Sequence, residues 1–200
     1  MATMNVSLST LWEGSEFQRS NRYGDSSATR IKNAGIIVRE FLKAGLPLGI
    51  ALAAVVNARD ESDLSSTVGG DEGQSIGLFQ LASFGAGAGM SVEERQDPKK
   101  NTQRIIEEVL NPRWGTNLIN AYNNGESLAT LSFIFGRDIE RPASGGVGRD
   151  DSARKVFPLI ADLPANMLSR KGAVMGTIAI TGVVALLVVG GLYLYSRRRQ

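Results

Sequence analysis

Apolar side chains recur every three or four residues from about residue 29 to residue 136, and this spacing predicts amphipathic helices. The first helix should start after Ser27 or Thr29, either of which can cap it, and stop at Gly45. Pro47 should open a second helix that runs to about Asp60. The inward face of the first helix is expected to carry Ile31, Ala34, Val38, Phe41 and Leu42.

Three shorter helices are predicted downstream. Asp97-Pro98 should cap the first of them, a segment at 116–123 with Thr116 as cap should form the second, and 127–136 behind Ser127 the third. Glycine is dense between 65 and 91, which predicts loops and a short β-hairpin there. The fold class is therefore mainly α with one small Gly-rich insert.

The chain from 172 to 195 carries no charged side chain. As a helix it would be about 36 Å long, enough to span a hydrocarbon core of about 30 Å. Aromatic residues near its end and a basic tail at 196–200 are typical of a membrane boundary. We expect one transmembrane helix at 172–195, with a buried core helix as the alternative. Basic residues flank both ends, so charge does not decide the orientation.

Cysteine and histidine are both absent from the 200 residues. Disulfide scaffolds, Cys/His zinc sites and Ser-His-Asp triads are thereby excluded, and acid–base chemistry falls to carboxylates, Lys or Tyr. The net charge is +2, but the basic side chains concentrate in residues 151–200, which leaves the rest of the chain mildly acidic. We therefore expect no nucleic-acid partner. The N-terminus also lacks the apolar stretch of a signal peptide.

The residues with the strongest chemical potential follow the second helix. Glu61 would lie at a helix C-terminus, where the helix dipole raises the pKa of a carboxyl group. Packing against Leu78 and Phe79 would raise the pKa of Glu61 further. A protonated glutamate that faces a polar, glycine-lined surface is suited to cleaving a glycosidic bond.

At this point the sequence resembles the lysozyme-like superfamily, which contains the soluble lytic transglycosylases and goose-type lysozymes. Glu61-Ser62 is followed by a Gly-rich run into Gly77-Leu78-Phe79-Gln80, which is similar to the order of motifs in that superfamily. The resemblance covers about residues 33–145. Further similar segments are Asp97-Pro98-x-x-Asn101, Ala121-Tyr122-Asn123-Asn124-Gly125 and the Glu140-Arg141-Pro142 ending found in phage-borne peptidoglycan hydrolases.

The resemblance implies a lysozyme-like α+β domain and assigns roles to particular residues. Glu61 would be the acid that protonates the oxygen between N-acetylmuramic acid and N-acetylglucosamine. In a lytic transglycosylase the same residue then acts as base while the C6 hydroxyl of the sugar attacks, whereas in an inverting lysozyme Asp71 would hold a water. No cofactor or metal is expected. Ser62 would orient the saccharide or the acid, and Gln80 would bind a sugar N-acetyl group or help to shape the cleft. Ser75 and Tyr122 are also expected to contact the saccharide.

The sequence leaves the residue that lines the cleft and the role of the Glu140-Arg141 pair open to alternative interpretations. The segment around Tyr122 follows Asp97-Pro98 sooner than in the transglycosylases, so Phe133 or Phe135 is the other candidate to line the cleft. Glu140 and Arg141 are expected to form a surface or structural ion pair of little energetic weight.

The resulting hypothesis is a phage virion enzyme, anchored in a membrane, that opens the cell wall by lytic transglycosylase activity during genome entry. Its partners would be peptidoglycan strands, the bilayer through 172–195 and other virion membrane proteins. The alternatives are an inverting goose-type lysozyme, a non-enzymatic structural protein of a virion membrane and a pore-forming membrane protein. The predicted organisation is a polar arm at 1–28, a catalytic domain at 29–145, a linker at 146–171, the membrane helix at 172–195 and a tail at 196–200.

Overall fold

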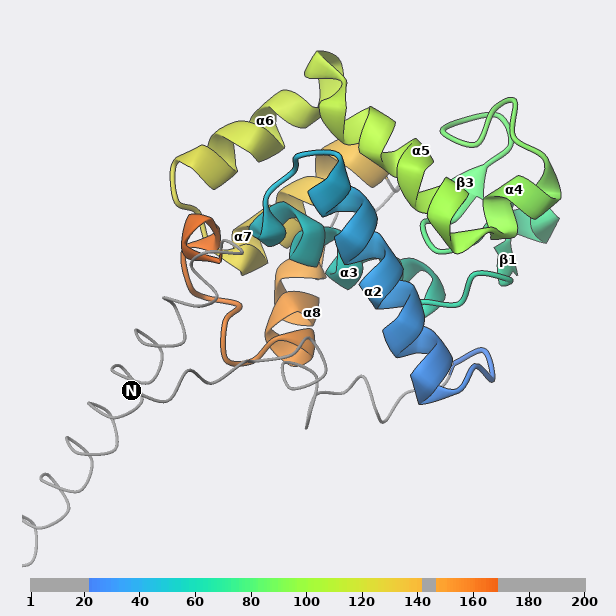
Figure 1. Ribbon diagram of the computed structural model, residues 1–200, viewed down its shortest axis with the longest axis horizontal. Coiled ribbons are helices and arrows are strands. Elements are labelled where there is room, and N and C mark those ends of the chain that lie inside the picture. The colour runs from blue at the N-terminus through green and yellow to red at the C-terminus, as the bar shows by residue number, and fades with distance from the viewer. Residues whose placement is uncertain (1–21, 142–146, 169–200) are drawn as a thin grey trace, which may run out of the picture.

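The computed structural model describes residues 22–141 and 147–168, which form a mainly helical body with a small sheet at one end (Figure 1). The mainly α fold class is thereby confirmed. The predicted membrane helix at 172–195 and the basic tail lie outside the described residues. Within the described ranges, no helix combines the length and the apolar character that crossing a bilayer requires.

Helix α2 (Ser27–Lys43) begins one residue after its cap, Ser26, whose hydroxyl accepts a hydrogen bond from the N–H of Thr29. The predicted caps, Ser27 and Thr29, are therefore wrong by one and three residues, and both lie inside the helix. The predicted arm at 1–28 overlaps the start of α2 for the same reason.

Helix α3 (Leu48–Ser62) is the central element of the body. Eleven of its fifteen residues are buried, because α2, α7 and α8 pack around it (Figure 1). A helix that is apolar on every face belongs in the interior of a domain. At its start, Gly49 allows the chain at Ala165 to approach so closely that an added Cβ would lie 2.6 Å from the Ala165 carbonyl oxygen.

The Gly-rich insert forms a three-stranded antiparallel sheet in the order β1-β2-β3. The expected hairpin is confirmed, with one additional strand. Short loops join the strands, which are β1 (Gly69–Gly70), β2 (Ser75–Ile76) and β3 (Leu81–Ala82), and a single turn of 3-10 helix, η2 (Asp71–Gly73), lies between the first two.

Helices α4 (Val92–Gln96) and α5 (Pro98–Leu110) hold the sheet against the body. Asp97 caps α5 as predicted, by accepting from the N–H groups of Lys99 and Lys100. Asn101 is fully buried, donates to the carbonyls of Ile76 and Arg95, and accepts from the N–H of Phe79. This side chain joins the first turn of α5 to the sheet.

Helix α6 (Pro112–Asn123) starts earlier than predicted because Asn111, not Thr116, caps it. Thr116 instead lies within the helix and donates its hydroxyl to the carbonyl of Pro112. The last predicted helix divides into α7 (Leu128–Ile134), capped by Ser127 as expected, and a π-helix, η3 (Phe135–Glu140).

The predicted linker at 146–171 is wrong for its described part. Helix α8 (Arg149–Val156) packs against α7 and α3, and a turn of 3-10 helix, η4 (Ala165–Met167), follows it. The N–H of Ala129 donates to the carbonyl of Ala161 at 2.8 Å, which ties this segment to α7. The domain that was predicted to end at 145 therefore extends to at least residue 168. The buried side chains of this segment are Ala153, Val156, Phe157, Ile160, Ala161, Ala165 and Leu168.

Candidate functional site

Glu61 lies in the last turn of α3, directly before a backbone reversal that side chains of α2 hold in place. Asp63 and Leu64 both adopt left-handed backbone angles, with φ of 51° and 61°. Arg30 donates to the carbonyl and the carboxylate of Asp63 at 3.1 and 2.9 Å, and Asn33 donates to the carbonyl of Leu64 at 2.8 Å. These buried bonds fix the point at which α3 stops and therefore the position of Glu61.

Three carboxyl groups surround the guanidinium of Arg149, which extends from the first turn of α8. Its Nη1 lies 3.0 Å from Oδ2 of Asp60, and its Nη2 contacts Oε1 of Glu61 and lies 3.6 Å from Oε2 of Glu140. We call Asp60, Glu61, Glu140 and Arg149 the Arg149 cluster. It brings together the ends of α3 and η3 and the start of α8, which are far apart in the sequence.

Glu61 is the most accessible acid of the cluster, with 22% of its side chain exposed. Burial raises the pKa of Glu61 above its ordinary value because desolvation penalises the charged form. The charge and the hydrogen bond of Arg149 oppose this rise, while the charges of Asp60 and Asp71 add to it. Glu61 therefore combines a side chain that is partly accessible to a ligand with the raised pKa that a general acid requires.

Glu140 is the most deeply buried acid of the cluster, with only 4% of its side chain exposed. Neither of its carboxyl oxygens has a hydrogen-bond partner among the described residues. Burial raises the pKa of Glu140 well above its ordinary value, the charges of Glu61 and Asp60 raise it further, and Arg149 lowers it. This carboxyl group favours its neutral form.

The predicted Glu140-Arg141 ion pair does not form in the structure. Glu140 reaches the buried cluster, whereas Arg141 lies 3.2 Å from Glu108 and stacks on Trp114 at 4.2 Å from the ring centroid. The sequence-based prediction missed Glu140 because the residue that it meets, Arg149, fell in the predicted linker. The apolar residues that follow Arg149, at 153, 156, 157 and 160, were the signal that this segment packs on the body.

Asp71 is exposed on η2 and accepts a hydrogen bond from the hydroxyl of Ser75 at 2.6 Å. Its charge acts on Glu61, which puts both carboxyl groups within electrostatic range of each other. Ser75 is almost fully buried, and its hydroxyl supports Asp71. The predicted contact of Ser75 with a saccharide is therefore not what the geometry favours.

Ser62 and Gln80 hold backbone in place. Ser62 is fully buried, and its hydroxyl lies 3.0 and 2.9 Å from the carbonyls of Ala58 and Leu78, so the predicted contact with substrate is wrong. Gln80 is half-buried and donates from Nε2 to the carbonyls of Val68 and Gly77 at 3.1 and 2.9 Å. Both side chains shape the sheet beside Glu61.

Tyr122 does not join the cluster. It lies near the end of α6, where the N–H of Ala165 in η4 donates to the carbonyl of Glu126 at 2.8 Å (Figure 1). Ala165 also touches Gly49 at the start of α3, whereas Glu61 lies at the other end of that helix, about 18 Å away. The contacts around this end of α6 therefore give no support to the predicted role of Tyr122 in binding the saccharide. Burial raises the pKa of the Tyr122 hydroxyl.

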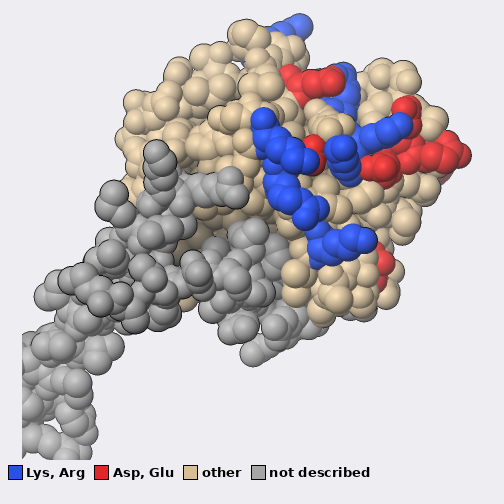
Figure 2. All heavy atoms as spheres, viewed as in Figure 1, with Lys and Arg blue, Asp and Glu red and all other residues tan. Residues whose placement is uncertain are grey.

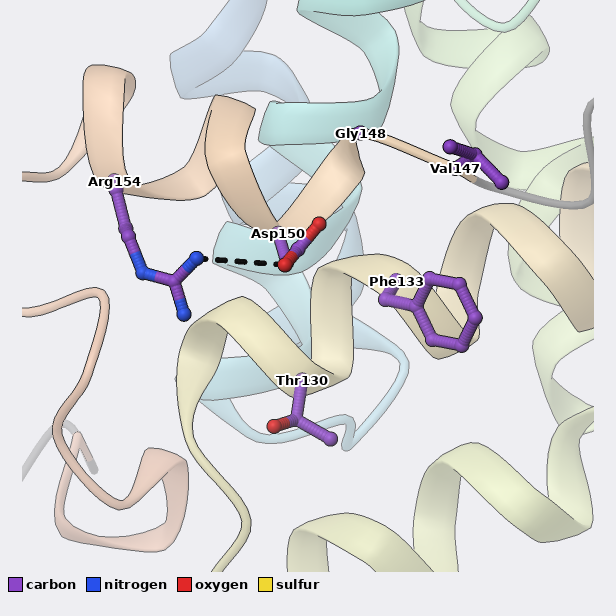
Figure 3. Close-up of a pocket in the computed structure, with 6 residues that line it drawn as sticks. All are labelled: Thr130, Phe133, Val147, Gly148, Asp150 and Arg154. Carbon is purple, nitrogen blue, oxygen red and sulfur yellow. Dashed lines mark hydrogen bonds and ion pairs between the residues drawn. The ribbon is translucent and has the colours of Figure 1, made fainter.

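The two alternative aromatic residues, Phe133 and Phe135, lie in different environments. Phe135 is fully buried between Phe41 and Phe79, with ring centroids 6.3 and 6.2 Å away, so it belongs to the core. Phe133 lines a hollow of about 360 Å³ between α7 and α8 (Figure 3). Asp150 and Arg154, one turn apart on α8, also line this hollow and form an ion pair at 3.4 Å.

The charges on the face viewed in Figure 2 are of both signs, with acidic groups beside the basic ones. In the described part of the chain, no group of three or more acidic side chains is arranged to hold a metal ion. Searches against known protein families, curated proteins and solved structures found no match to this chain. The resemblance to lysozyme-like enzymes therefore depends on the motifs themselves.

Proposed function

We propose that the protein is a peptidoglycan lytic transglycosylase in which Glu61 is the catalytic acid. The observation that carries this proposal is a partly exposed glutamate of raised pKa at the end of a buried helix, beside a Gly-rich sheet. The Glu-Ser and Gly-Leu-Phe-Gln motifs and the mainly helical body with a small sheet support it as well.

In this mechanism Glu61 donates its proton to the oxygen between N-acetylmuramic acid and N-acetylglucosamine, and the glycosidic bond breaks. The resulting carboxylate then takes the proton of the C6 hydroxyl of the muramic acid, whose oxygen closes the 1,6-anhydro ring. One carboxyl group serves as acid and then as base, so no nucleophilic carboxylate is required.

The test is a zymogram on purified peptidoglycan with mass spectrometry of the released fragments. Glu61→Gln should lower the rate of clearing by at least about 100-fold, because general acid catalysis contributes about 10²- to 10⁴-fold. Glu72→Gln, which removes an exposed carboxylate from the neighbouring turn, is the matched control and should retain activity. The fragments should carry 1,6-anhydro ends.

Equal clearing by wild type and Glu61→Gln would contradict the assignment of the acid. No clearing by either protein would instead favour the non-enzymatic role in a virion membrane.

An inverting lysozyme is the second candidate, and the electrostatic influence of Asp71 on Glu61 favours it. In this reaction Asp71 would activate a water on the opposite face of the sugar, and the fragments would carry ordinary reducing ends. Product analysis therefore distinguishes the two reactions.

We further propose that residues 172–195 anchor the enzyme in a virion membrane and that the tethered enzyme opens the wall locally during genome entry. The support is the uncharged run of the sequence and its basic flanks. Tethering keeps an enzyme at high effective concentration near its substrate. In a liposome flotation assay the full chain should float and a chain ended at residue 168 should not. Flotation of both would contradict the anchor.

A further inference from the structure

The Arg149 cluster contains a second carboxyl group, Glu140, that the proposed reaction does not use. Nη2 of Arg149 contacts Glu61 and lies 3.6 Å from Glu140, so the two carboxyl groups meet at one nitrogen atom. Asp60 is paired separately, because Nη1 of Arg149 and the guanidinium of Arg59 each approach it, at 3.0 and 2.9 Å. Within the described residues, Arg149 is the base in contact with both glutamates.

The charges of this cluster do not balance if every acid is ionised. Asp60, Glu61 and Glu140 would carry three negative charges against the two positive charges of Arg59 and Arg149. An uncompensated charge in a buried position is costly, and the group takes up a proton instead. With Arg59 counted, one proton on either glutamate makes this group of five side chains neutral.

At rest the proton belongs on Glu140. Its carboxyl group is less exposed than that of Glu61, at 4% against 22%, and lacks any hydrogen bond that would stabilise a charge. Glu61, in closer contact with Arg149, is then the ionised member of the pair. An ionised Glu61 is the wrong form for a general acid, so the resting cluster requires a proton transfer before the bond is cleaved.

We propose that Glu140 is a positioning residue that stores the proton that Glu61 delivers, with Arg149 exchanging its ion pair from Glu61 to Glu140 as the proton moves. The second half of this inference, the delivery of the proton to a glycosidic oxygen, rests on the proposed function. The storage of the proton depends only on the cluster.

The step balances within the protein. The O–H bond of Glu140 breaks, an O–H bond forms on Glu61, and the electron pair left on Glu140 is stabilised by Nη2 of Arg149. The number of charges in the cluster does not change, so the transfer avoids the cost of creating a buried charge. Glu61 then protonates the leaving oxygen, and the base step returns a proton to it.

The backbone holds Glu140 at this point by an unusual local structure. Glu140 is the last residue of the π-helix η3, and short π-helical turns are frequently found at functional sites. The next residue, Arg141, has a left-handed φ of 55° and is held by Glu108 and by the ring of Trp114. The adjacent side chains of Glu140 and Arg141 therefore lie in different surroundings, the first in the Arg149 cluster and the second against Glu108 and Trp114.

The first experiment is the pH dependence of kcat/KM for wild type, Glu140→Gln and Arg149→Gln. The groups that face Glu61 are Asp60 on its own helix, Asp71 from the sheet, Glu140 from η3 and Arg149 from α8, and only the last two are changed. In Glu140→Gln, Arg149 keeps its ion pairs with Asp60 and Glu61 and favours the ionised form of Glu61. Activity at neutral pH should fall at least about tenfold, the equivalent of one pKa unit, while activity at acidic pH stays near that of wild type.

Arg149→Gln should move the alkaline limb of the profile in the opposite direction, to higher pH, because the charge that ionises Glu61 is removed. The matched control is Glu40→Gln, which removes another buried, ion-paired glutamate on a different side of the body. Its profile should coincide with that of wild type. A merely structural role of Glu140 would lower activity at every pH, and such a result, or an unmoved profile, overturns the proposal.

The second experiment does not depend on activity. Infrared difference spectroscopy at neutral pH should detect a protonated carboxyl group in wild type and in Glu40→Gln, but not in Glu140→Gln. If the carboxyl band is present as expected while the zymogram is negative, the protonation of Glu140 is supported and the proposed function is contradicted. Absence of the band in wild type, or its persistence in Glu140→Gln, overturns the proposal whatever the activity.

Discussion

Among single residues, Glu61 and Ser62 show how adjacent side chains of one motif acquire different roles. Glu61 is on the side of the last helical turn that reaches Arg149, and it keeps contact with solvent. Ser62 points into the body and bonds to the backbone of its own helix and of the sheet. The motif therefore marks a partly exposed carboxyl group at the end of α3, whereas its serine is buried and bonds to backbone.

The role of Asp71 is tested by identifying the products of the reaction. Under the proposed transglycosylase mechanism, Asp71→Asn should retain activity of the same order as wild type and should still release 1,6-anhydro fragments. Under inverting hydrolysis the same variant should lose about 100-fold or more in rate, because a general base has been removed. Muropeptide analysis by mass spectrometry measures both quantities, with Glu72→Gln as the neighbouring control. A large loss of activity would exclude the transglycosylase mechanism as proposed.

At the scale of secondary structure, α8 is the element that changes the description of the protein most. Its sequence is dominated by charged residues, and this pattern favoured a linker. The apolar residues that follow it are few, but they are buried against α3 and α7. The segment therefore belongs to the domain and brings Arg149 to Glu61.

A pair of substitutions tests this conclusion. Phe157 is 1% exposed and Leu159 is 74% exposed, although only one residue separates them. Phe157→Ala should lower the free energy of unfolding by about 3–5 kcal/mol, because it removes a large buried side chain and leaves a cavity. Leu159→Ala should change it by less than about 0.5 kcal/mol. Urea denaturation followed by circular dichroism gives both values. Equally small effects of the two substitutions on the free energy of unfolding would support the interpretation of this segment as a linker.

At the same scale, helix positions were predicted better than helix starts. Asp97 was identified as a cap because a proline follows it, and Ser127 because an apolar run follows it. Ser26 and Asn111 were missed because other polar residues inside the helices offered equally good local patterns. The choice among neighbouring caps depends on small differences in backbone geometry that a residue pattern does not contain.

For the whole molecule, the buried glutamates should make stability depend on pH in a characteristic way. The pKa of Glu140 is raised on folding, so between the unfolded and the folded pKa the native state holds a proton that the unfolded state releases. Stability is therefore expected to fall as pH rises from the unfolded pKa toward the folded pKa, by at most about 1.4 kcal/mol per pH unit for one proton. Urea unfolding at a series of pH values should show this slope in wild type and its loss in Glu140→Gln.

Glu40 supplies a control of opposite sign. Its hydrogen bond and ion pair with Lys43 lower the pKa of Glu40, so its contribution is present above the unfolded pKa and is lost as pH falls through the folded value. Glu40→Gln should therefore be less stable than wild type at neutral pH, with the difference closing at acidic pH. A slope that is identical in wild type and Glu140→Gln would contradict the neutral buried Glu140.

The sequence by itself determined the approximate positions of α2, α3, α5, α6 and α7, the Gly-rich sheet and Glu61 as the candidate acid. These features depend on apolar periodicity, on capping residues and on glycine, which act within a few residues of each other. Only the tertiary structure decided that Ser62 is buried, that Tyr122 lies far from Glu61 and that Glu140 and Arg149 meet Glu61. The physical reason is that burial and neighbouring charge, which set the chemistry of a carboxyl group, come from segments of the chain that are distant in sequence.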